Sequence, residues 1–177
     1  MVKKITVFFL YLIFLILSIM YFTPKSNFYY FAEKQLQKID IIISTETIDD
    51  RLLTFKVEYL DVSYNEIQSA KIDSVTIKIF GIYNSLNFEN IVLSSVAQSF
   101  LPLNIENIHI VYSILNPLNI KIHALGDFGE TNIEFNFIGR VLHVVLNPSE
   151  LMLQDYQHTL QKLNKNENGE FIYDKTF

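Results

Sequence analysis

The sequence predicts a mainly β protein, in which a single N-terminal transmembrane helix precedes a curved, mostly antiparallel, meandering sheet with two short flanking helices. Three observations predict it. The apolar run from Ile5 to Phe22 contains no charge, glycine or proline. From residue 40 onward apolar and polar residues alternate, which is the period of strands with one buried face. The chain has 15 phenylalanines and 10 tyrosines but only 5 glycines, and aromatic residues suit a pleated, half-buried surface.

The apolar run predicts an uncleaved membrane anchor. As a helix, Ile5 to Phe22 would span about 27 Å at about 1.5 Å per residue, close to the roughly 30 Å of a bilayer's hydrocarbon core. A cleaved signal peptide has a shorter apolar core and ends in small residues, whereas this run ends in Tyr21 and Phe22. The side chains expected to contact lipid are Ile5, Val7, Phe8, Phe9, Leu10, Leu12, Phe14, Leu15, Ile16, Leu17, Ile19 and Met20.

Charges on both sides of the run bear on its orientation. The amino terminus, Lys3 and Lys4 favour a cytoplasmic start, whereas Lys25, Lys34 and Lys38 on the other side favour the reverse. A long downstream domain is exported largely regardless of its charge. We therefore expect residues 1–4 to be a cytoplasmic stub, residues 5–22 the anchor, and the remainder periplasmic.

Residues 23–39 predict a short amphipathic helix. Ser26 is the expected N-cap. Apolar residues recur at helical spacing on one face. Two positions fit such a helix: it closes one end of the sheet, or it lies along the bilayer surface with Tyr29 and Tyr30 near the headgroups. The residues of the predicted apolar face are Phe28, Phe31, Ala32, Leu36 and Ile39, with Gln35 as its polar exception.

Residues 40–177 predict the β-rich domain, with eight or so strands. No long helical pattern separates the alternating segments, so parallel crossovers are not expected and the strands should form an antiparallel meander. Turns are expected at Asn116-Pro117, Gly126-Asp127 and Gly139-Arg140. The alternating apolar positions begin with Leu53, Phe55, Val57 and Tyr59, continue through Val75, Ile77 and Ile79, and recur up to Leu142, Val144 and Leu146.

A short repeat lies within this region. Leu86-Asn87-Phe88-Glu89-Asn90-Ile91 returns as Leu103-Asn104-Ile105-Glu106-Asn107-Ile108, and Ile72-Asp73-Ser74-Val75 is a fainter copy. Apolar residues three apart break strict alternation, so each copy predicts a bulge or a strand start where the buried face changes. The alternative is that biased composition produced two similar strand entries.

A second helix is expected near residues 148–163. Asn147 is the predicted N-cap, with Pro148 as the first helical residue and Glu150 three residues after the cap. Met152, Tyr156, Leu160 and Leu163 should line one face of this helix. A polar loop over 164–169 and a last strand containing Phe171 and Tyr173 should follow.

The composition excludes several kinds of site. The net charge of −5 argues against nucleic acid, which attracts clustered basic residues. The absence of cysteine excludes disulfides and cysteine metal sites. The four histidines lack metal-site spacing, and His109, His123 and His143 fall on the polar positions of strands. We expect no catalytic residue, metal or cofactor, and therefore no enzyme.

The order of these features resembles the AsmA-like superfamily of Gram-negative envelope proteins, which includes the N-type protein of type II secretion systems. The resemblance lies in Leu86 to Leu146, in the two copies of the repeat and in Ala124-Leu125-Gly126-Asp127-Phe128-Gly129. It implies a bacterial inner-membrane location and a curved periplasmic sheet with an apolar trough, in a class associated with lipid handling and envelope assembly. The chain is too short to bridge the periplasm alone.

Two functions follow from this expectation. The first is a membrane-anchored structural or assembly component of an envelope machine of the secretion or motility type, with the bilayer and protein partners as its contacts. The second is a lipid-binding protein in which the trough holds a phospholipid. Which applies depends on whether the two helices close the sheet or cover only its ends. The candidate lipid-facing residues are Ile110, Tyr112, Ile120, Ile122, Phe135 and Phe137.

Overall fold

The computed structural model describes residues 2–22, 25–51, 54–79 and 82–177, without the side chains of residues 2, 20 and 28. Its helices are α1 (Val2–Phe22), α2 (Ser26–Gln37), α3 (Glu150–Asp155), α4 (Gln157–Leu160) and the short 3-10 helix η1 (Ser95–Ser99). Its strands are β1 (Ile41–Ser44), β2 (Thr47–Asp50), β3 (Thr54–Tyr64), β4 (Ile67–Ile79), β5 (Tyr83–Leu93), β6 (Asn104–Ser113), β7 (Asn119–Gly126), β8 (Gly129–Asn136), β9 (Val141–Pro148), β10 (Asn164–Lys165) and β11 (Phe171–Thr176).

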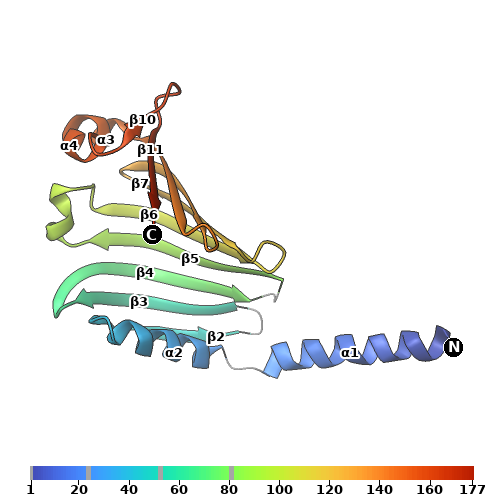
Figure 1. Cartoon of the computed structure of the whole chain (residues 1–177). Coiled ribbons are helices and arrows are strands. Elements are labelled where there is room, and N and C mark those ends of the chain that lie inside the picture. Colours follow the sequence, from blue (N-terminus) through green and yellow to red (C-terminus); the bar gives the residue numbers. More distant parts are fainter. Residues whose placement is uncertain (1, 23–24, 52–53, 80–81) are drawn as a thin grey trace.

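All strands of the described chain form one curved antiparallel sheet (Figure 1). The order is β1-β3-β4-β5-β6-β7-β8-β9-β11-β10, and β2 also pairs with β3. The predicted mainly β fold and antiparallel meander are thus confirmed. The sheet has 11 strands rather than eight or so, because the edges carry short strands that alternation does not reveal. One of them, β10, lies in the expected loop over 164–169.

The strands change their buried face where the repeat copies lie, and we call this line across β3, β4 and β5 the crease. Tyr59 in β3 and Asn90 in β5 have φ angles of 59° and 51°, and both lie opposite Asp73 of β4 in the register. The register of β6 shifts at Glu106. Because a residue in the left-handed region interrupts the regular alternation of side chains, the apolar face moves from odd to even positions along β3. The predicted face change is confirmed, and the expected burial of Tyr59 is wrong: its side chain is exposed.

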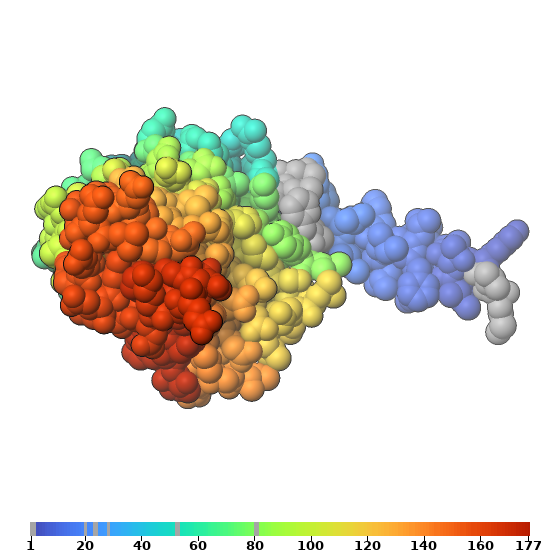
Figure 2. Space-filling model, turned by 90° about the horizontal axis from the view of Figure 1, so that it is seen from above, coloured from blue at the N-terminus to red at the C-terminus, as the bar shows by residue number. Residues whose placement is uncertain are grey.

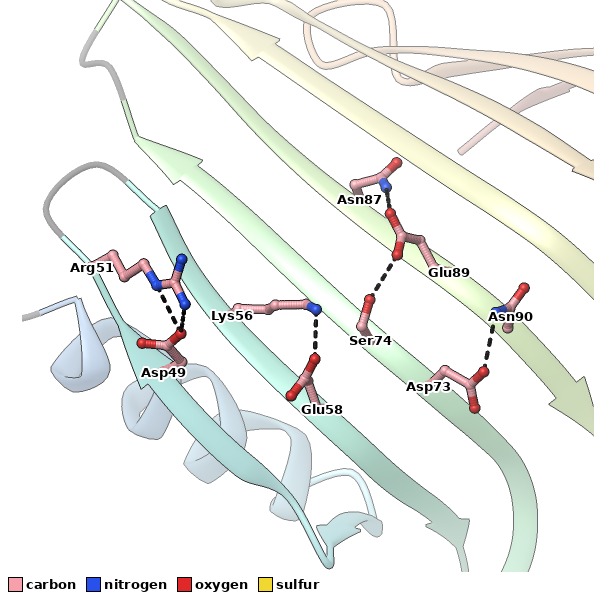
Figure 3. A network of polar contacts seen from close by, with 9 residues as sticks. All are labelled: Asp49, Arg51, Lys56, Glu58, Asp73, Ser74, Asn87, Glu89 and Asn90. Atoms are coloured by element: carbon pink, nitrogen blue, oxygen red, sulfur yellow. Dashed lines mark hydrogen bonds and ion pairs between the residues drawn. The ribbon is translucent and has the colours of Figure 1, made fainter.

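The repeat copies lie side by side in the sheet. Ile91 pairs with Ile72 on one side and with Ile105 on the other. On the opposite face the copies are joined by polar side chains, as Figure 3 shows: the buried Ser74 donates to Glu89 across 2.9 Å, and Asn87 also donates to Glu89. The sheet therefore has one apolar and one polar face along its length.

The helix boundaries differ from the expected ones. Lys25, not Ser26, occupies the N-cap of α2, and no side chain caps this helix. Ser149, not Asn147, caps α3 by accepting a hydrogen bond from the Met152 backbone N–H. Pro148 belongs to β9, because that strand continues through residues expected to start the helix. The expected helix over 148–163 is interrupted at Tyr156, which separates α3 from α4.

Helix α1 extends away from the sheet (Figures 1 and 2). Every described side chain that was expected to contact lipid, from Ile5 to Ile19, is exposed. The side chain of Met20 lies outside the described residues. A search of the described residues finds no helix that meets the usual length and apolarity of a membrane span.

Candidate functional site

The two ends of the apolar face are covered by different helices. Under α2, the buried core consists of Tyr29, Phe55, Val57, Leu60 and Val75. Under α3 and α4, a second core contains Ala124, Phe128, Leu146, Met152, Leu160 and Phe171. Tyr156 and Leu163 pack against this second core, so the predicted inward face of the C-terminal helix is confirmed although the helix is broken. The helices cover the two ends of the face and leave a stretch between them.

A cavity of about 330 Å³ lies between α2 and the apolar face of the sheet. Its size is within the range of small-molecule sites, about 300–1,000 Å³. Its walls are almost entirely apolar, although Lys25, Tyr29 and Glu33 are among the lining residues. The residues that line it are Lys25, Tyr29, Ala32, Glu33 and Leu36 of the α2 segment and Ile43, Phe55, Leu60, Val75, Ile77, Ile79, Leu86 and Phe88 of the sheet.

Tyr29 places a hydrogen-bonding group in this apolar setting. Its side chain is 8% exposed and its ring centroid lies 5.5 Å from that of Phe55. The hydroxyl is buried and has no hydrogen-bond partner among the described residues. Burial, reinforced by the charges of Glu46 and Glu33, raises the pKa of Tyr29 well above its usual range. The group is therefore a neutral donor, and leaving it unpaired costs about 1–3 kcal/mol.

Lys25 fixes the start of α2 against the sheet. Its ammonium donates to the Arg51 carbonyl at 2.8 Å and pairs with Asp50 at 3.4 Å. The Asp50 carboxylate also accepts the Ser26 backbone N–H. Lys25 is 7% exposed, so this charge is satisfied within the protein and joins the start of α2 to the end of β2.

The residues of the α2 segment that face the sheet differ from the predicted ones. Phe31 was expected on the buried face but is 64% exposed, and Ile39 is exposed beyond the end of the helix. The stripe that faces the sheet is Lys25, Tyr29, Ala32 and Leu36. Its spacing of four, three and four residues was available in the sequence, but it begins with a lysine and includes a tyrosine, which an apolar pattern passes over. Tyr29 is therefore packed against Phe55, whereas Tyr30 is exposed.

The six candidate lipid-facing residues belong to the stretch between the helices. Ile110 pairs with Ile122, and Ile120 pairs with both Tyr112 and Phe135. All five are half-buried and belong to neither buried core. Phe137 follows β8, is 46% exposed and packs edge-on against Phe135 at 5.0 Å. The structure thus brings the six together on one face.

This half-buried stretch continues the cavity wall. Leu86, which lines the cavity, pairs directly with Ile110 of the next strand. At its other side Phe135 lies 6.4 Å from the ring of Phe177. An apolar path therefore runs from the cavity under α2 across the middle of the sheet to its rim.

The polar face of the sheet carries three of the four histidines, and His158 lies in α4. His109 and His123 are cross-strand neighbours, and His123 contacts Asn132 at 2.9 Å. His143 pairs with Asp174 at 2.6 Å. In the described part of the chain, no group of three histidine or acidic side chains is placed to hold a metal.

Comparisons of the chain with protein-family models, curated proteins and solved structures give no match. The resemblance to the AsmA-like superfamily therefore remains a prediction based on the pattern of the sequence.

Proposed function

We propose that this protein is a membrane-anchored lipid-binding protein that accepts an acyl chain on the apolar face of its sheet. The observation that carries the proposal is the almost entirely apolar cavity under α2, whose lining residues include Tyr29 with its buried, unpartnered hydroxyl. Each methylene group moved from water into such a site contributes about 0.8 kcal/mol. A shift of the Tyr29 side chain on binding would let an ester or carboxyl oxygen of the acyl chain accept its hydroxyl hydrogen bond and remove the cost of the unpaired donor.

Helix α1 is the proposed anchor, in the bacterial inner membrane, with its amino terminus in the cytoplasm and the sheet in the periplasm. Support comes from the uncharged run of Ile5 to Phe22 and from the exposure of its apolar side chains. A carboxyl-terminal fusion to a reporter that is active only in the periplasm tests the orientation. Activity of a cytoplasmic reporter at the same position would reverse it.

Filling the cavity tests the lipid site. Ala32 lines the cavity but is exposed on α2, so Ala32→Trp can enter the cavity without rebuilding the core. Gln35→Trp places the same side chain on the same helix away from the cavity. Native mass spectrometry of the full chain extracted in detergent should show phospholipid on the wild type and on Gln35→Trp, and loss of most of it from Ala32→Trp.

Tyr29→Phe distinguishes a cavity that binds lipid from a cavity that stays empty. In the lipid-free protein this change removes an unpaired buried hydroxyl and should raise the free energy of unfolding. In the lipid-bound protein it should remove a hydrogen bond and weaken binding roughly tenfold, corresponding to about 1.4 kcal/mol. A wild-type chain that carries no lipid would contradict the proposal. Capture of one protein partner by such a lipid-free chain would favour the assembly component of an envelope machine.

A further inference from the structure

One border of the sheet begins beside the start of α2. In an antiparallel meander alternate turns lie at the same ends of the strands, so the β4–β5, β6–β7 and β8–β9 turns and the C-terminal end of β11 follow one another along this border of the curved sheet. The contact of Lys25 with Arg51, in the β2–β3 turn, brings the start of α2 to this same edge. We call it the anchor-side edge. Figure 2 shows the yellow β6–β7 segment on the side from which α1 extends.

The tips of these turns are apolar and exposed. Leu115 is 84% exposed and Ile138 is 73% exposed. Large apolar side chains that gather in one exposed region often mark an interaction site. The exposed apolar side chains of the anchor-side edge are Ile82, Ile114, Leu115, Phe137, Ile138 and Phe177.

The charges at this edge favour an anionic lipid surface. Residues 113–118 contain no charge, and Arg140 is the only charge in residues 137–140. Lys175 lies over the Phe177 ring at 4.8 Å. Of the acidic residues near this edge, Asp50 pairs with Lys25, Asp49 with Arg51 and Asp174 with His143. The opposite edge instead carries the exposed acidic residues Asp40, Glu66, Glu150, Asp155 and Glu167.

We propose that the anchor-side edge sits in the headgroup region of the bilayer, with the turn residues Leu115 and Ile138 inserted among the lipid chains. Apolar and aromatic side chains beside basic ones are the usual contacts of proteins that lie on a membrane surface. The apolar path through Phe135 and Phe177 reaches this edge. An edge that lies in the headgroup region therefore gives an acyl chain a continuous apolar route onto the sheet. This inference rests on the proposed anchoring by α1.

Single tryptophan probes test it, because the chain has no tryptophan of its own. The full-length variants Leu115→Trp, Ile138→Trp, Val96→Trp and Phe14→Trp are reconstituted in vesicles of phosphatidylcholine and phosphatidylglycerol with brominated acyl chains. Val96 is the matched control, since it is 68% exposed at the opposite edge. Phe14 reports the anchor.

The expected result is that Phe14→Trp, Leu115→Trp and Ile138→Trp each lose most of their fluorescence relative to non-brominated vesicles, while Val96→Trp keeps its own. If Phe14→Trp is quenched but both turn probes behave like Val96→Trp, the proposed position of the edge in the bilayer is wrong and the anchoring by α1 is supported. If Phe14→Trp is not quenched, both the anchoring by α1 and the position of the edge are wrong. Two turn probes on separate hairpins keep the test decisive if one variant does not fold.

Discussion

Asn90 of β5 donates a 3.1 Å hydrogen bond from its side-chain amide to Asp73 of β4, and this bond joins two copies of the repeat at the crease. Asn90 has a φ of 51°, a conformation that asparagine adopts far more readily than β-branched residues. The pair therefore supports the point at which the apolar face changes from one set of positions to the other.

Replacing Asn90 tests the crease. Asn90→Val should lower the free energy of unfolding by about 2–3 kcal/mol, because valine is strained at positive φ and the hydrogen bond is lost. Asn90→Gly loses the hydrogen bond but adopts the φ freely, so its cost should stay within about 1 kcal/mol. Urea unfolding followed by circular dichroism measures both. Equal stability of the two variants would show that the backbone conformation is not required.

Sequence pattern predicted the sheet well because its alternation is strong and its turns are short. The sequence also predicted the change of buried face, because Phe88 and Ile91 are three residues apart and so break the alternation of a strand. The edge strands were missed because pairing, not composition, makes strands of residues such as Asn164 and Lys165. The cavity was missed because its wall on α2 includes Lys25, whose charge is satisfied by Asp50 from 25 residues away. Such a contact has no local signature.

Ser149 at the start of α3 and Ser26 at the start of α2 provide a matched pair of variants that test the N-cap assignments. Ser149→Ala should cost about 1 kcal/mol of unfolding free energy, because the Ser149 hydroxyl oxygen accepts the Met152 N–H at 3.1 Å. Ser26→Ala should change stability little, because no side chain caps α2. Thermal unfolding of the two variants measures the difference. A larger effect at Ser26 would contradict the cap assignment.

Gly129 is the glycine whose replacement should be most harmful. It has a φ of 110°, and a Cβ there would approach the Ser149 backbone nitrogen to 2.7 Å. Gly129→Ala should therefore cost at least about 2 kcal/mol. Gly169 also has a positive φ, of 87°, but open space around it, so Gly169→Ala should cost about 1 kcal/mol from strain alone. Chemical denaturation distinguishes them, and equal costs would mean that contact with β9 and Ser149 is unimportant.

The buried Tyr29 hydroxyl predicts a loss of stability at alkaline pH. Burial raises the pKa of Tyr29 in the folded protein, whereas in the unfolded chain it loses its proton near pH ~10. Above that pH the folded state binds more protons than the unfolded state, so stability falls as pH rises. Tyr29→Phe should make this fall less steep.

Unfolding of lipid-free protein in urea, repeated from pH 8 upward to about pH 11, measures the slope. Tyr30→Phe is the matched control, because the Tyr30 ring is 52% exposed and lies outside the cavity lining. It should retain the wild-type slope. Identical slopes for Tyr29→Phe and the wild type would show that the hydroxyl is not buried in the folded protein.

The most direct test of the central claim locates a lipid on the protein. The full chain is reconstituted with a phospholipid that carries a photoreactive diazirine in its acyl chain, irradiated, and mapped by peptide mass spectrometry. Adducts are expected on the cavity walls, at Leu36, Ile77 and Leu86, in addition to α1. They should be lost from the cavity but not from α1 in Ala32→Trp. Adducts confined to α1 in the wild type would contradict the account.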